Sequence, residues 1–411
     1  MSSTTATDSA NGNGDAVFHV RIADSFEDIE QVAWDGLNGA NKAAEGAAYN
    51  PFLSYAFLSA LEESSSAVRE TGWYGQHLLL EDDRGNLLGG ATGYVKSHSQ
   101  GEYVFDHAWA DAYERAGGRY YPKLLSSIPF TPATGPRLLT SPQVNPEAGR
   151  VALASAMAQL SDKMGLSSAH VTFATQADVD AMKKCGFLHR TDQQFHFRNM
   201  GYGSYADFLE TLSSRKRKNL KKEREGAKAN HIDIEWLTGS DLTEDVLDTF
   251  FTFYTDTGNR KWGRPYLTRD FFSLVAERMS DDILLVMAKR DGRHIAGAIN
   301  FVGSDTIFGR HWGCIEHHPF LHFEVCYHQA IDFAIERGLK VVEAGAQGEH
   351  KLARGYLPVM THSAHYIPHE GFRNAIADYL EHERSDVERF GKILTRAAPF
   401  KKKDPSNPAE S

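Results

Sequence analysis

Cysteine is scarce in this chain of 411 residues, which contains only Cys185, Cys314 and Cys326. An odd number of cysteines without paired spacing excludes a disulfide scaffold and is typical of a reducing compartment. Basic residues are in the minority: 44 Lys and Arg stand against 54 Asp and Glu, a net charge of −10 that disfavours a general nucleic-acid coat. No apolar run reaches the roughly 20 residues of a membrane-spanning helix. These absences predict a cytoplasmic protein.

Apolar residues are plentiful enough for a folded chain, since 41% of the residues are hydrophobic and 11% are aromatic. The length predicts roughly two to three domains. Residues 1–16 are rich in Ser, Thr, Ala, Asn and Gly, which predicts a disordered tail without the basic and apolar regions of a secretory signal. Residues 401–411 are expected to form a second, flexible tail.

An internal repeat organises the remainder of the chain. Residues 78–95 and 283–302 both read as strand, turn and strand, and Gly85 in the first turn aligns with Gly292 in the second. Chance similarity of two hairpins is the alternative. Duplication is favoured because further elements recur in the same order after each hairpin.

Those further elements complete two similar halves. A third strand is expected at 103–107 and 307–312, then a helix ending in Gly-Leu at 165–166 and 338–339, then a strand at 169–173 and 341–344. Early helices are expected at 25–37 and 51–63 in the first half and at 242–255 and 268–278 in the second. The predicted fold class is therefore α+β, with two tandem mixed-sheet domains at 17–200 and 201–400.

The element order resembles the GNAT acyl-CoA N-acyltransferase fold, and the tandem copy looks like its Fem-type branch. The chain is similar to the bacterial FemAB-like, or peptidoglycan biosynthesis/recognition, family in Asn50–Ser54, His98–Tyr121, Gly309–Gly313 and Glu343–Pro358. The similarity runs from about residue 17 to 395. It implies a transferase that moves an acyl or aminoacyl group from acyl-CoA or aminoacyl-tRNA to an amine acceptor, such as a small molecule or a cell-wall precursor.

One departure from the resembled fold concerns the donor. Ordinary GNAT enzymes carry a Gln/Arg-x-x-Gly-x-Gly/Ala turn that cradles the coenzyme A pyrophosphate at a helix N-terminus. The second half has His317–His322 before its helix instead, and the first half has Ser141–Pro146. The missing turn leaves an aminoacyl-tRNA donor open. No motif in the sequence identifies the amine acceptor or the oligomeric state.

The most specific matching segment follows the last predicted strand. It passes through Gly345 and Gly348, which permit close backbone approach, and then becomes densely charged. Glu343 and Glu349 are candidate bases, and Lys351 and Arg354 are candidate anion-binding groups. Together with Gln347 and His350, they form a candidate site. The alternative is a solvated loop with ordinary surface charges.

Two further groups stand at the predicted ends of the third strands. The first contains the candidate substrate-binding residues Asp106, His107 and Trp109, and the second contains Arg310, His311 and Trp312. Histidine titrates near neutrality, so His311 is a candidate base, and tryptophan offers a stacking wall. Core strands with polar ends are the alternative. Tyr121 is a candidate from a loop that either lines the same cleft or packs as an aromatic loop.

The chain has one strongly basic segment, Arg215–Arg224, on a predicted helix. It predicts either a solvated helix or a surface for tRNA or another anionic ligand. The 19 histidines include no His-Glu-x-x-His motif and are not accompanied by Cys-x-x-Cys, so no metal site is expected. Two other functions remain open. One is a non-catalytic protein that binds an aminoacylated or glycan ligand, and the other is an RNA-binding adaptor.

Overall fold

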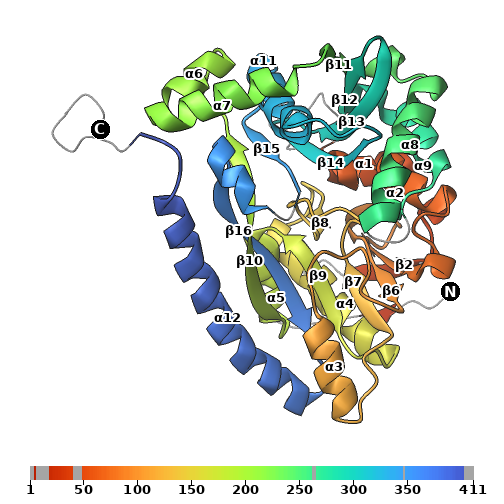
Figure 1. Cartoon of the computed structure of the whole chain (residues 1–411). Helices are drawn as coiled ribbons and strands as arrows, with labels where there is room; N and C mark the ends of the chain where they lie inside the picture. Colours follow the sequence, from red (N-terminus) through yellow and green to blue (C-terminus); the bar gives the residue numbers. More distant parts are fainter. Residues whose placement is uncertain (1–3, 6–17, 40–48, 262–264, 346–347, 402–411) are drawn as a thin grey trace. The chain divides into compact units, whose positions relative to one another are not determined.

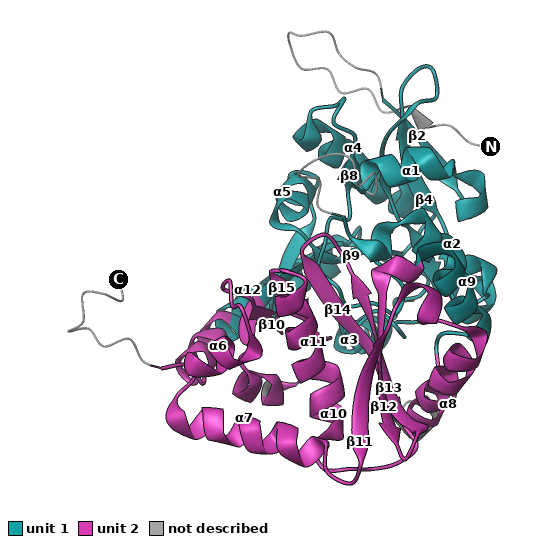
Figure 2. Ribbon diagram, turned by 90° about the horizontal axis from the view of Figure 1, so that it is seen from above, with its two compact units in different colours: residues 1–192, 266–279, 360–387 teal, residues 193–265, 280–359, 388–411 magenta. Residues whose placement is uncertain are grey.

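The computed structural model describes residues 4–5, 18–39, 49–261, 265–345 and 348–401. Its chain divides into two compact units, coloured separately in Figure 2. Unit 1 comprises residues 1–192, 266–279 and 360–387, and unit 2 comprises residues 193–265, 280–359 and 388–411. The first change of unit falls between residues 192 and 193, and two later segments return to unit 1. The boundary predicted at residues 201–204 stays a prediction.

Unit 1 contains two sheets and the helices that flank them (Figure 1). Its strands are β1 (Thr4–Thr5), β2 (His19–Ala23), β3 (Trp73–Gly75), β4 (His77–Glu81), β5 (Leu87–Ala91), β6 (Tyr94–Lys96), β7 (Lys123–Ser126), β8 (Leu139–Thr140) and β9 (Ala169–Ala174). Its α-helices are α1 (Gln31–Leu37), α2 (Tyr55–Glu63), α3 (His107–Arg115), α4 (Pro146–Lys163), α5 (Gln176–Lys184) and α9 (Arg269–Met279). Short 3₁₀ helices are η1 (Phe26–Asp28), η2 (Pro51–Leu53) and η3 (Arg69–Thr71).

Unit 2 contains one mixed sheet with its own helices. Its strands are β11 (Ile232–Leu237), β12 (Ile283–Arg290), β13 (Arg293–Val302), β14 (Thr306–Cys314) and β15 (Val341–Glu343). Its helices are α6 (Tyr205–Glu210), α7 (Ser214–Ala227), α8 (Glu244–Lys261), α10 (Leu321–Phe323), the π-helical η6 (Glu324–His328), α11 (Gln329–Glu336) and the 3₁₀ helices η4 (Gly239–Asp241), η5 (Ser280–Asp282) and η7 (Glu349–Arg354). Three elements cross between the units, namely β10 (Leu188–Arg198), β16 (Leu357–Tyr366) and α12 (Glu370–Arg396).

Both units combine antiparallel strands with one parallel pair. In unit 1 one sheet has the order β1-β2-β4-β5-β8, and the other runs β3-β6-β7-β9-β16 with β7 and β9 parallel. In unit 2 the order is β11-β12-β13-β14-β15-β10, with β14 and β15 parallel. The α+β prediction with mixed sheets and flanking helices is confirmed.

Local sequence explains why these elements form. Asp291 and Gly292, with φ of 49° and 79°, make the two-residue turn between β12 and β13, as an Asp-Gly pair favours. Helix α4 begins after Asn145, whose side chain accepts two backbone N–H bonds, with Pro146 in its first turn. Apolar side chains of β12, such as Leu284 at 0% exposure, form a core with the helices of unit 2.

The predicted strand at 103–107 is wrong. Tyr103 has φ of 59°, a left-handed conformation that interrupts a strand, and His107 begins helix α3. Inward-turned Glu102 and Asp106 belong to a buried ionic group around Lys123, so tertiary contacts override the apolar pattern of this segment. The first predicted hairpin is present, since β4 and β5 pair antiparallel, but its second predicted strand, 87–95, divides into β5 and β6 of different sheets.

The predicted tails fall mostly outside the described residues. Thr4 and Thr5 pair with Val20 and His19, whereas residues 1–3, 6–17 and 402–411 are not described. The early helices are found near their predicted places, although 25–37 and 51–63 each consist of a 3₁₀ turn followed by an α-helix. No helix within the described ranges is long and apolar enough to cross a membrane.

Candidate functional site

The candidate site of unit 2 lies where two parallel strands part. Strand β14 pairs with β15 only from Thr306 to Phe308, opposite Val341 to Glu343, and then continues to Cys314 beside β13 alone. The register between β13 and β14 shifts at this point, because Ile299 pairs with His311 and Asn300 with Gly309. Arg310 is therefore the extra residue of a β-bulge. Bulges of this kind bend a strand and redirect its side chains, and they are frequent beside active sites.

The end of β15 carries the predicted base Glu343. Its side chain is 10% exposed, and its Oε1 lies 3.8 Å from Nε2 of His196 on β10. Burial lowers the pKa of His196 to about 3, with further contributions from Arg198 and Lys351, so the imidazole beside Glu343 is neutral at pH 7. Nε2 of His196 also lies 3.2 Å from Oε1 of Gln194. Sequence patterns gave no signal for His196, because nothing marks β10 as the neighbour of β15.

Lys351 reaches the same end of the sheet from η7. Lys351 is 1% exposed, and its Nζ donates a hydrogen bond to the carbonyl oxygen of Gly345 at 2.8 Å. Burial lowers the pKa of Lys351 to about 8, and the positive charge of Arg310 contributes to the shift. Gly345 and Gly348 have φ of 79° and 120°, so the loop adopts the conformations that the glycine pattern predicts. An ammonium group is thereby held beside the bulge of β14.

Arg354 has a different environment from the one that its sequence position suggested. Its Nε and Nη2 donate to both carboxylate oxygens of Glu223 on α7 at 2.7 and 2.6 Å, and its Nη1 donates to the carbonyl of His350 at 2.7 Å. The guanidinium carbon also lies 3.4 Å from the ring centre of Phe323. Arg354 thus joins η7 to α7, and each of its three guanidinium nitrogens donates one hydrogen bond within unit 2.

His350 and Trp312 adjoin a group of aromatic side chains from the helix after β14. His350 Nε2 lies 2.9 Å from the hydroxyl of Tyr327, and the rings of Trp312 and His322 are 5.2 Å apart. His322 is also 5.5 Å from Tyr327 between ring centres. Tyr327 lies in the π-helical η6, a type of irregularity that is common at functional sites.

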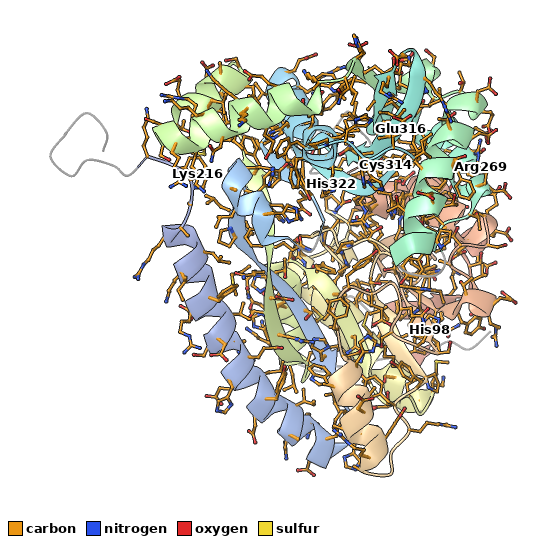
Figure 3. The ribbon with its side chains drawn as sticks, viewed as in Figure 1. His98, Lys216, Arg269, Cys314, Glu316 and His322 are labelled. Atoms are coloured by element: carbon orange, nitrogen blue, oxygen red, sulfur yellow. The ribbon has the colours of Figure 1, made fainter. Side chains whose placement is uncertain are left out.

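A small pocket of about 180 Å³ opens at the start of this helix. Cys314, Glu316 and His322 lie together here (Figure 3), and the complete lining is Thr257, Trp312, Cys314, Glu316, His317, His318, Leu321 and His322. Glu316 is bound by Arg290 and lies 3.1 Å from Nε2 of His318. The segment His317–His322, which stands where a GNAT enzyme has its pyrophosphate-binding turn, therefore lines a pocket.

His311 is held close to an aromatic side chain at the bulge. Its ring centre is 4.9 Å from that of Tyr254. Burial, with a contribution from Arg310, lowers the pKa of His311 to about 3. A histidine with so low a pKa is a weak base at pH 7. Glu349 begins η7, but its side chain is not described, and Gln347 lies outside the described residues.

The remaining predicted residues belong to unit 1, where they adjoin a buried ionic group. Nζ of Lys123 donates to Ser99 and Glu102 at 2.7 Å each and contacts Asp106. Tyr121 joins this group through a 2.8 Å hydrogen bond to Ser99.

The partners of Asp106 and Trp109 extend the group toward two histidines. The hydroxyl of Tyr120 donates to Asp106 at 2.7 Å and lies 3.3 Å from Nε2 of His170. Trp109 packs at 4.9 Å against His365, whereas His107 is exposed. The predicted residues of 106–121 thus gather in unit 1 and those of 310–354 in unit 2. No group of three or more metal-ligating side chains is found among the residues described.

Comparison with known proteins places the chain in a family. Residues 25–402 match the FemAB-like family, described as peptidoglycan biosynthesis/recognition. No curated protein matches the chain significantly.

Solved structures resemble the chain at low sequence identity. The crystal structure of FemX is 12% identical, with a TM-score of 0.52 over 85% of this chain and 98% of that chain. A conserved protein of unknown function from Bacteroides thetaiotaomicron is 10% identical, with a TM-score of 0.50 over 85% and 99%. A tandem GNAT protein from the clavulanic acid biosynthesis pathway is 11% identical, with a TM-score of 0.43 over 85% and 98%. The family match covers most of the sequence and confirms the resemblance that its motifs predicted: the chain belongs to the FemAB-like family.

Proposed function

We propose that unit 2 transfers an acyl or aminoacyl group from a thioester or ester donor to an amine. The observation that carries this proposal is the parting of β14 and β15 beside the bulge at Arg310, with Glu343 and Lys351 at the same end of β15. A carboxylate and an ammonium beside an open strand edge supply the two groups that acyl transfer to an amine requires, a proton acceptor and a donor to the carbonyl oxygen.

In the proposed reaction the amine nitrogen attacks the acyl carbon directly. A C–N bond forms, the C–O or C–S bond to the donor breaks, and the proton of the amine passes to Glu343, directly or through water. The same proton then passes to the departing oxygen or sulfur, which leaves as an alcohol or a thiol. The ammonium of Lys351 stabilises the negative charge that develops on the carbonyl oxygen. Its pKa of about 8 keeps it mostly charged at pH 7, and its buried position strengthens the interaction.

The other two predicted bases rank behind Glu343 in this proposal. His311 has a pKa of about 3, so it would hold a proton poorly at pH 7. Glu349 belongs to the same loop as Lys351 and stays a candidate. We propose substrate contacts for Arg310, Trp312, Gln347 and His350, and an indirect role for Arg354 through its pair with Glu223.

The donor is proposed to be acyl-CoA or aminoacyl-tRNA. The pocket at His317–His322 lies before the helix where a GNAT enzyme binds pyrophosphate, but its lining includes Glu316 and three histidines instead of a glycine-rich turn. Helix α7 presents exposed Arg215, Lys218, Lys221 and Lys222, whereas Arg224 binds Glu324 and Asp332. The exposed cations favour a polyanionic donor.

Ligand-induced thermal stabilisation tests the donor. A ligand that binds only the folded protein raises its melting temperature, so acyl-CoAs, free coenzyme A and aminoacyl-tRNA are compared directly. The salt dependence of tRNA binding is a second test of the donor. Replacing Lys218, Lys221 and Lys222 by Gln should make the plot of log affinity against log salt concentration less steep. The slope should fall by about 0.7 to 0.9 for each phosphate that α7 no longer neutralises. A flat salt response in the wild type would exclude a tRNA surface on α7.

Turnover separates catalysis from binding alone. Glu343→Gln should lower kcat by about 10²- to 10⁴-fold with the fold intact, as expected for loss of a general base. The second candidate function is non-catalytic binding of an aminoacylated or glycan ligand, and it is favoured by the absence of the pyrophosphate turn. If the protein only binds its ligand, Glu343→Gln would weaken affinity and have no other effect.

We also propose a cytoplasmic location and a cell-wall precursor as the amine acceptor.

A further inference from the structure

An open cavity of about 800 Å³ is lined by residues of unit 1, and none of the candidate site residues described above lines it. Helices α2 and α9, strand β3 and the η1 turn contribute to its lining. Buried Phe26 and Trp73, with exposures of 0% and 1%, supply apolar surface, and half-buried Tyr55 adds another ring. The volume is in the range of small-ligand sites.

Glu62 is a fixed negative charge in this cavity. Its Oε2 accepts hydrogen bonds from the hydroxyl of Ser25 and the backbone N–H of Phe26, both at 2.8 Å. Its Oε1 lies 2.9 Å from Nε2 of His77, and the side chain is 14% exposed. A carboxylate held by three partners needs no further ordering when a ligand arrives, which reduces the entropic cost of binding.

Most of the charged side chains that line the cavity are negative. Four carboxylates line it, those of Asp24, Glu27, Glu62 and Glu63, against two guanidiniums, those of Arg69 and Arg278. Arg278 is bound to Glu63 at 2.5 Å. The guanidinium carbon of Arg69 lies 3.8 Å from the ring centre of Tyr74.

The environment of Tyr55 shows where these charges converge. Burial raises the pKa of its hydroxyl, Arg278 opposes the increase, and Glu27, Glu62 and Glu63 add to it. Three carboxylates therefore act on one hydroxyl group inside the cavity. Arg278 also acts on this hydroxyl, so three negative charges and one positive charge meet there, a net charge of −2. A positive group placed beside the hydroxyl would be attracted by this net charge, and an anion would be repelled.

We propose that this cavity binds a ligand with a primary ammonium group next to an apolar segment. The ammonium lies beside Tyr55, near Glu62 and Glu63, and the apolar segment packs on Phe26 and Trp73. Aromatic rings suit both parts, because they offer apolar surface and attract cations. A free diamine and the side chain of a peptide lysine share this chemistry. The inference is independent of the reaction proposed for unit 2.

Calorimetric titration of the full chain tests this inference. Cadaverine represents a free diamine, and Nα-acetyl-L-lysine amide represents a peptide lysine, while 1-pentanol and glutarate lack the ammonium. We expect one or both amines to bind, with an affinity that falls as salt is added, and the two controls not to bind. Which amine binds identifies the source of the ligand. If neither amine binds at millimolar concentration, or if 1-pentanol binds equally well, the proposal is wrong.

Two variants locate the binding. Glu63→Gln should weaken amine binding about tenfold, whereas Glu277→Gln, an exposed residue of the same helix as Arg278 that does not line the cavity, should leave it unchanged. Glu62→Gln should weaken binding at least as much, and its melting temperature shows whether the contacts of Glu62 with Ser25 and Phe26 are retained. Equal affinities of Glu63→Gln and Glu277→Gln would place the amine elsewhere and overturn the proposal.

Discussion

Both units contain buried lysines, and Lys123 of unit 1 and Lys351 of unit 2 differ in the groups that surround them. Lys123 in unit 1 is 0% exposed and is surrounded by Ser99, Glu102 and Asp106. Burial alone would lower the pKa of Lys123, but the two carboxylates outweigh it and raise the pKa. Lys351 in unit 2 is equally buried, donates to a backbone carbonyl, and has a pKa of about 8, lowered by burial and by Arg310.

This comparison shows that burial of a charged group does not by itself indicate function. The ammonium of Lys123 is neutralised by its own chain, so it acts as a structural link between β7 and the segment before α3. Among the described residues, the groups that shift the pKa of Lys351 include no carboxylate. A positive charge with this little compensation is suited to a negative group that arrives with a substrate.

The largest effect is expected from removing the charge of Lys123. Lys123→Met removes the ammonium that binds Glu102 and Asp106 and leaves them buried with Lys96 nearby. Removing one partner of a buried ion pair typically costs about 3–5 kcal/mol. Chemical denaturation should show this loss in the free energy of unfolding. Lys183→Met, whose side chain is 46% exposed, is the matched control and should change stability by less than about 1 kcal/mol. Equal losses in the two variants would contradict the structural role of Lys123.

The same substitution at Lys351 should have the opposite pattern. Lys351→Met removes a poorly compensated buried charge, so stability should stay the same or increase. Turnover should fall by about 10²- to 10³-fold, because a donor to the developing oxyanion is lost. Lys340→Met, with a side chain that is 76% exposed, controls for loss of a surface lysine. A large loss of stability in Lys351→Met would make Lys351 a second structural lysine.

A smaller effect is expected from acid on the histidines beside Lys123. Burial, together with the charge of Lys123, lowers the pKa of His170 to about 3 from an ordinary 6.5, and Nδ1 of His170 lies 2.6 Å from Nδ1 of His365. The neutral form therefore contributes stability that is complete above pH 6.5 and is lost as the pH falls toward 3. At pH 5 the loss attributable to His170 should be about 2 kcal/mol.

Unfolding free energies of the wild type and His170→Gln between pH 7 and pH 5 measure this contribution. The wild type should lose about 2 kcal/mol more than the variant over this range, because only its unfolded state takes up a proton at this position. Parallel pH dependences would show that His170 is not held neutral in the folded protein.

Sequence patterns were sufficient for elements whose signals are local. The Asp291-Gly292 turn, the strand before Glu343 and the basic helix α7 all follow from residues adjacent in the chain. The patterns failed at 103–107, where a distant partner, Lys123, draws Glu102 and Asp106 inward.

The candidate site shows the same limit. The loop of Lys351 was predictable from its glycines and charges, since both are features of one short segment. His196 and the pairing of Arg354 with Glu223 were not, because sheet order and helix packing bring those residues together from far along the chain. Patterns along a sequence therefore find site loops more readily than the groups that tune them.

The smallest effect, a pH profile, distinguishes the two possible protonation states of Lys351 in catalysis. Comparing the wild type with Lys351→Arg at each pH cancels the ionisation of Glu343 and of the acceptor amine. If the ammonium stabilises the oxyanion, the ratio of wild-type to variant activity should be constant just below pH 8 and fall about tenfold per pH unit above it, because the lysine loses its proton there. Lys351→Arg keeps its charge at every accessible pH, so whatever activity it retains should not fall between pH 8 and 10. A ratio of wild-type to Lys351→Arg activity that rises through pH 8 would show that the neutral amine of Lys351 is the active form, and Lys351 would then accept a proton in place of Glu343.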